Sequence, residues 1–166
     1  MIAMASNGTM WWQKWGNAAQ IAAALIAVCG FAAVLLQLNE LRNNNRATSA
    51  RQVYLAYLDL EFRNPEFAVP DYESIKVGDR ATRLRYESFV AYLLYACEEA
   101  LTAFAKMKEW QNSCESDVSA HLPFLCEKSV QEPGFLKTYN DKTQSFVKAA
   151  MAAAGVTPTD CKLRKT

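Results

Sequence analysis

The sequence predicts an all-α protein in which one N-terminal transmembrane helix precedes a small bundle of four to five helices. Two observations lead to this prediction. Residues 18–38 form an apolar run without any charge, in which only Gln20 and Gln37 are polar. Across residues 86–107, apolar side chains recur at spacings of three and four, which is typical of a helix with one buried face.

The apolar run is long enough to cross a lipid bilayer. A helix of 21 residues rises ~31 Å, which matches the ~30 Å hydrocarbon core of a membrane. A helix also satisfies its own backbone N–H and C=O groups, as lipid requires. We therefore expect a transmembrane helix over residues 17–38, after an N-terminal interfacial segment over residues 1–16.

Tryptophan and arginine residues flank this run and are expected to anchor it in lipid headgroups. Indole rings favour the membrane interface, and arginine side chains reach it from the helix ends. The expected anchors are Trp11, Trp12, Trp15, Arg42 and Arg46.

The basic residues also predict an orientation. Only Lys14 precedes the run, whereas Arg42, Arg46 and Arg51 follow it. Because the flank richer in Lys and Arg is retained in the cytoplasm, we expect a periplasmic N-terminus and a cytoplasmic segment 39–166.

Two alternatives compete with the transmembrane interpretation, a cleaved signal peptide and a buried core helix. The run exceeds the apolar region of about 7–15 residues in a typical signal peptide. A lipoprotein signal ending at Cys29 is disfavoured because the bulky Val28 precedes the cysteine.

Small side chains form a row along the expected span. They follow one another at spacings of three and four and are Ala19, Ala23, Ala27, Gly30 and Val34. Small residues let two helices approach closely in lipid. The row therefore predicts packing against another membrane protein or a second copy of this chain.

The remaining chain is long enough for one compact domain. From residue 39 onward, 17 basic residues balance 17 acidic ones, so no basic face for nucleic acid is expected. We divide this part into a polar neck over 39–52, a helical domain over 53–155 and a tail over 156–166.

Caps and helix breakers outline the elements of the domain. Three consecutive asparagines leave open whether the neck is helical or bent. Residues 53–62 are so apolar that we expect them to be covered on most sides. The expected elements are a helix ending at Asn64-Pro65, a short turn over 65–68, a loop over 69–78, a helix over 80–111, a break over 112–116, a helix over 117–130 interrupted at Pro123, and a last helix from Glu132-Pro133-Gly134 to before Gly155.

The cysteines are expected to be free thiols. One lies in the span (Cys29), and four lie in the chain after it (Cys97, Cys114 and Cys126 in the domain, and Cys161 in the tail). An odd number of buried cysteines suits the reducing cytosol. If the domain lay outside, Cys114 and Cys126 would be the plausible disulfide.

No arrangement of residues predicts catalysis or a cofactor. The adjacent carboxylates Glu98 and Glu99 point ~100° apart on a helix, and no phosphate-binding loop or nucleophile motif occurs. Cys114, His121 and Cys126 are the weak candidates for a metal site, although six and four intervening residues differ from structural zinc spacing.

The chain resembles a widespread group of bacterial single-span membrane proteins with a small helical C-terminal domain. The resemblance covers nearly the whole length and is strongest at Asn45-Arg46-Ala47-Thr48 and Asn64-Pro65-Glu66. It implies an inner-membrane location and this architecture, without an activity. The row of small residues in the span and the absence of a catalytic arrangement lead us to expect an accessory or scaffold subunit acting by protein–protein interaction within a membrane complex. The alternative is a membrane-anchored thiol or metal sensor using Cys114, His121 and Cys126.

Overall fold

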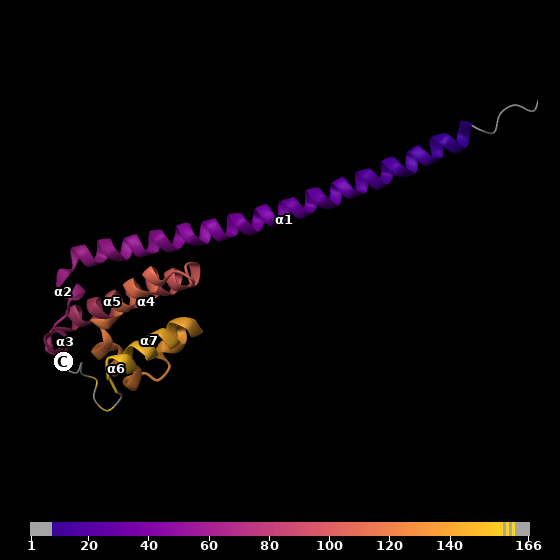
Figure 1. The fold of residues 1–166 in the computed structure, drawn as a ribbon. Helices are drawn as coiled ribbons and strands as arrows, with labels where there is room; N and C mark the ends of the chain where they lie inside the picture. Colours follow the sequence, from indigo (N-terminus) through magenta and orange to yellow (C-terminus); the bar gives the residue numbers. More distant parts are fainter. Residues whose placement is uncertain (1–7, 158, 160, 162–166) are drawn as a thin grey trace, which may run out of the picture. The chain divides into compact units, whose positions relative to one another are not determined.

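A computed structural model describes residues 8–157, 159 and 161, with side chains from Gln20 onward. All regular elements in these residues are helical, which confirms the predicted all-α class. They are α1 (Gly8–Arg63), α2 (Pro65–Ala68), α3 (Tyr72–Val77), α4 (Arg80–Ala103), α5 (Lys108–Ser119), α6 (Leu122–Gln131), the 3-10 helix η1 (Phe135–Thr138) and α7 (Asp141–Ala153) (Figure 1). The chain divides into two compact units, Met1–Asn44 and Asn45–Thr166.

Helix α1 passes through the neck without interruption (Figure 1). The three asparagines at 43–45 therefore do not break it, which answers the question that the sequence left open. The helix ends at Arg63, and the next residue, Asn64, forms hydrogen bonds with the last turn of the helix. Its backbone N–H donates to the Leu60 carbonyl at 3.1 Å, and its side-chain amide donates to the same oxygen at 2.7 Å. Pro65 then begins α2 at a position that needs no N–H donor.

One face of the last part of α1 packs on the helical domain. Ala50, Tyr54 and Tyr57 are buried on this face. The Tyr54 ring meets Trp110 of α5 edge-on at 5.1 Å, and the Tyr57 ring lies 5.7 Å from Phe89 of α4. Aromatic rings thus attach residues 45–63 to the domain.

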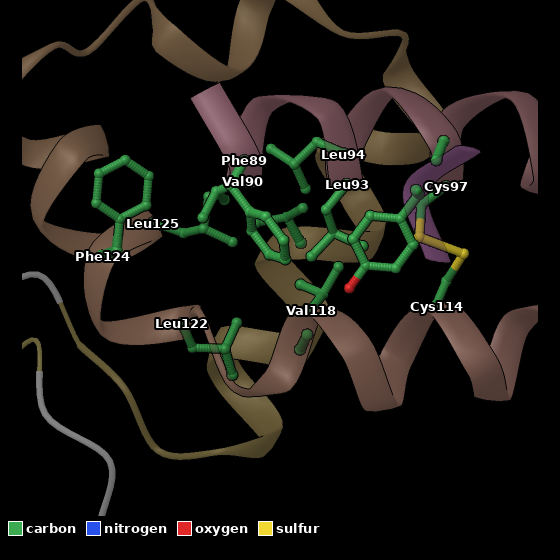
Figure 2. Packing of buried hydrophobic residues seen from close by; sticks show 14 of the residues in the cluster. Phe89, Val90, Leu93, Leu94, Cys97, Cys114, Val118, Leu122, Phe124 and Leu125 are labelled. Atoms are coloured by element: carbon green, nitrogen blue, oxygen red, sulfur yellow. A yellow bond between two sulfur atoms is a disulfide. The ribbon is translucent and has the colours of Figure 1, made fainter. Parts of the chain in front are cut away.

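Helix α4 forms the centre of the hydrophobic core (Figure 2). It begins at the predicted residue, Arg80, directly after Asp79, whose carboxylate caps the helix by accepting a hydrogen bond from the Thr82 backbone N–H at 2.9 Å. Within α4, the apolar residues with the predicted helical spacing are buried together, including Phe89, Val90, Leu93, Leu94 and Cys97, whereas Met107 beyond the helix is 48% exposed.

The helix predicted over 80–111 is interrupted earlier than expected. Helix α4 ends at Ala103, and α5 begins at Lys108 and continues through the predicted break at 112–116. The turn occurs at Phe104, which stacks on Trp110 at 4.7 Å and an interplanar angle of 11°. Burial of this aromatic pair favours a reversal here, because the reversal packs α5 against α4.

Two further segments differ from the prediction. The predicted loop over 69–78 contains α3, because the Asp71 side chain accepts from the Ser74 N–H and starts a helical turn. The predicted last helix begins as η1 and restarts as α7. There the Asn140 side chain caps the new helix by accepting from the Thr143 N–H at 2.9 Å.

The interruption expected at Pro123 is a boundary between two helices. Helix α5 ends at Ser119, and Pro123 lies in the first turn of α6. A proline at this position lacks only an N–H that has no partner within the helix. The last helix ends before Gly155, as predicted, and Gly155 adopts a left-handed φ of 67°.

Candidate functional site

One helix in the described part of the chain is long and apolar enough to cross a membrane. Its segment Gln20–Arg63 contains an 18-residue window of mean hydropathy 2.5, and none of this window is buried. Its length and composition fit a membrane span and equally fit a signal sequence or a buried helix.

The predicted row of small residues lies open on α1. Ala23, Ala27, Gly30 and Val34 are exposed, and a Cβ atom added at Gly30 would meet nothing within 4 Å. A second helix can therefore approach this row closely.

The predicted interface anchors are described only on one flank. Arg42 and Arg46 are exposed on α1. The structure describes side chains only from Gln20 onward. It therefore does not describe those of Ala19 in the small row or of the anchors Trp11, Trp12 and Trp15.

A second exposed apolar surface lies on the domain itself. Residues 53–62 were expected to be covered on most sides, and this prediction was wrong. Leu55, Leu58 and Phe62 are 64%, 40% and 85% exposed, because the domain packs only against the face that carries Tyr54 and Tyr57. We call Leu55, Leu58 and Phe62 the outer α1 face. Their spacing of three and four places them together along the helix.

All four cysteines of the unit Asn45–Thr166 are paired, which corrects the expectation of free thiols. Cys97 of α4 bonds to Cys114 of α5, and Cys126 of α6 bonds to Cys161. The alternative pair Cys114–Cys126 is also wrong. The packing of α5 on α4 brings the Cα atoms of Cys97 and Cys114 to 5.6 Å, so Cys114 already has a partner (Figure 2).

His121 is a fully buried core residue. Its Nδ1 lies 2.9 Å from the Tyr86 hydroxyl, and its ring lies 5.7 Å from that of Phe89. Burial lowers the pKa of His121 to about 4, so its imidazole is neutral at pH 7. Its Nε2 has no hydrogen-bond partner among the described residues.

The three weak metal candidates are therefore held by other interactions. Cys114 and Cys126 are bonded to different cysteines, and His121 contacts Tyr86. No group of three His, Cys, Asp or Glu side chains in the described residues is placed to hold a metal ion.

The adjacent carboxylates do not form a shared site either. The Glu98 carboxylate accepts a hydrogen bond from the Asn140 backbone N–H at 2.7 Å, which ties α4 to the start of α7. An open hollow of about 700 Å³ lies nearby between α4, α5 and α7, with Glu115, Asp141 and Lys142 in its lining. None of the predicted site residues lines this hollow.

A partly buried hydrogen bond joins the outer helix to the domain. The Tyr54 hydroxyl donates to the Asp117 carboxylate at 2.6 Å. Burial raises the pKa of both groups, and the bond to Tyr54 offsets part of the shift at Asp117. The sequence placed Asp117 near a helix start and carried no signal of its partner 63 residues away.

We expect Tyr54→Phe to destabilise the domain by about 1–3 kcal/mol, because it leaves a half-buried carboxylate without its donor. Chemical denaturation of the full chain in detergent measures this change. Tyr95→Phe is the matched control, because Tyr95 is 47% exposed. Equal stability of the two variants would contradict the contribution of the Tyr54–Asp117 bond.

Comparisons with family models, with curated proteins and with solved structures find no significant match to this chain.

Proposed function

We propose that this protein is a single-pass membrane-anchored accessory or scaffold subunit that acts by protein–protein interaction within a membrane complex. The observation that carries the proposal is the outer α1 face. Leu55, Leu58 and Phe62 are exposed together on one face of α1, opposite the face whose Tyr54 and Tyr57 are buried in the core. Grouped apolar side chains of this kind are typical of contact surfaces.

The long apolar helix supports the proposed membrane anchoring. The segment has the length and hydropathy of a span, and the resemblance to bacterial single-span proteins favours the inner membrane. Ala23, Ala27 and Gly30 then supply a close-packing surface within the lipid, where small residues are the main route to helix association. The partner is another membrane protein or a second copy of this chain.

The orientation has two opposing indications. Arg42, Arg46 and Arg51 favour a cytoplasmic domain, which is the orientation expected from the sequence. The disulfides Cys97–Cys114 and Cys126–Cys161 favour an oxidising compartment. The proposed role in interaction holds for either orientation, since the outer α1 face and the row of small residues are present in both.

We expect Phe62→Glu to reduce recovery of the partner about 10- to 100-fold. Burial of one large apolar side chain stabilises a contact by about 1.5–3 kcal/mol, and each 1.4 kcal/mol is a factor of ten in affinity. The measurement is crosslinking of the full chain at native abundance in membranes, followed by mild-detergent isolation and quantitative mass spectrometry.

The matched control is Val77→Glu on α3. Val77 is 84% exposed, as Phe62 is 85% exposed, but it lies outside the outer α1 face. The proposal predicts that V77E retains the partner that F62E loses. A wild-type chain that is monomeric and recovers no membrane partner, or an F62E chain that recovers the same partners as V77E, overturns the proposal.

A further inference from the structure

We infer that the helical domain lies on the oxidising side of the membrane, where Cys97–Cys114 and Cys126–Cys161 form as structural disulfides. The inferred location of the domain relative to the membrane depends on the anchoring in the proposed function. The inferred oxidation of the four cysteines does not depend on it. The inference reverses the orientation that the arginine distribution predicts.

Geometry is the first support for the inference. The Cα atoms of the two pairs lie 5.6 Å and 5.4 Å apart, within the 4.4–6.8 Å range that disulfides span. Each bond joins segments that are distant in sequence, by 17 and by 35 residues. The fold therefore brings together two separate pairs, and no backbone movement is needed to link either of them.

The distribution of the cysteines is the second support. Every cysteine of the domain has a cysteine partner, and Cys29 in the apolar segment is the one unpaired cysteine of the described residues. The sequence alone relates the odd number of cysteines to free thiols. The five cysteines are instead two disulfide-bonded pairs and one unpaired cysteine, Cys29, in the apolar segment. An even set of paired cysteines in a small domain is typical of oxidising compartments.

The position of the first pair is the third support. Cys97 and Cys114 are fully buried between α4 and α5, next to Leu94 and Val118 in the core (Figure 2). The bond is therefore shielded from solvent and links the two helices whose packing forms the centre of the domain. A linkage at this place stabilises the fold itself, as expected of a structural disulfide.

The opposing indication is weaker than these observations. The charge asymmetry consists of three arginines after the apolar run and one lysine, Lys14, before it. An excess of Lys and Arg on one flank usually determines the orientation of a span, but it has exceptions. Two cysteine pairs, by contrast, would each be kept reduced by the thiol systems of the cytosol.

Formation of the two disulfides requires an oxidant, which an oxidising compartment supplies. In each pair, two S–H bonds break, one S–S bond forms, and two protons and two electrons leave. A disulfide-bearing thiol oxidoreductase accepts them and becomes a dithiol. Two such exchanges oxidise the four cysteines of the domain.

The first arm of the test counts thiols in the full chain in bacterial membranes. Cells are quenched with acid, and a maleimide that adds a fixed mass is applied in denaturant before and after reduction. We expect one reactive thiol (Cys29) before reduction and five after it. The variant C97S/C114S should give one before reduction and three after it. Five reactive thiols before reduction overturn the inference.

The second arm locates the domain. A membrane-impermeant maleimide is applied to intact spheroplasts that carry Val77→Cys, since Val77 is 84% exposed and its replacement leaves the core intact. Labelling in intact spheroplasts supports the inference, and labelling only after lysis overturns it. The wild-type chain is the control for labelling at Cys29.

The two arms also separate this inference from the proposed function. A chain that is oxidised but washes off the membrane confirms the oxidising compartment and overturns the anchored subunit. A chain that is anchored, binds a partner through Phe62 and has five free thiols leaves the proposed function in place and overturns the inference.

Discussion

Removal of the Cys97–Cys114 disulfide is expected to lower the free energy of unfolding of the helical domain by about 3 kcal/mol. The bond links residues separated by 17 positions, and closing a loop of this size restricts the unfolded chain by about that amount. The expected result applies to C97A/C114A in the full oxidised chain in detergent. It is measured by denaturant unfolding followed by near-ultraviolet circular dichroism.

A longer loop gives a second, graded expectation. The Cys126–Cys161 bond links residues separated by 35 positions, so C126A/C161A is expected to lose about 4 kcal/mol. The matched control is C29A, which removes an exposed unpaired cysteine and should leave the midpoint unchanged. If C97A/C114A unfolds at the same denaturant concentration as C29A, the bond makes no contribution.

Local signals predicted some of the helix boundaries. Asp79 followed by Thr82 marks a cap, and the Asn64-Pro65 pair ends one helix and begins the next; both features depend on neighbours within four residues. The spacing of apolar residues through α4 also predicted its buried face, because a helical period repeats within a single element. Such features are visible in the sequence since each involves only one helix.

Features that depend on contacts between helices were not predicted. The reversal at Phe104 follows from its stacking on Trp110, and periodicity alone favoured one longer helix through this point. Phe62 is exposed because the domain packs only against the opposite face of α1, which carries Tyr54 and Tyr57. The apolar composition of residues 53–62 alone indicates a helix that is covered on most sides.

In the candidate site, too, the contacts between helices were not predicted from the sequence. Cys114 and His121 were grouped because they are close in sequence, yet their partners are Cys97 on α4 and Tyr86 on α4. The count of five cysteines favoured free thiols, because the count does not separate the span from the domain. Only the packing of α5 on α4 shows which cysteines meet.

Acid is expected to destabilise the domain through His121. The imidazole is buried and has a pKa of about 4 in the folded chain, against about 6.5 when unfolded. Between these values the unfolded chain binds the extra proton, so stability falls as the pH falls. The difference corresponds to about 3 kcal/mol, which is lost progressively from pH 6.5 and fully below pH 4.

The comparison that isolates this effect is His121→Gln in the full oxidised chain. Glutamine still offers a polar partner to the Tyr86 hydroxyl, which lies 2.9 Å from Nδ1, but it does not titrate. Asp117 and Glu61 act in the opposite direction, because burial raises their pKa, and both remain in the variant. We therefore expect wild type to lose about 3 kcal/mol more than H121Q between pH 7 and pH 4. Parallel pH profiles for the two chains would show that His121 is protonated without cost in the folded domain.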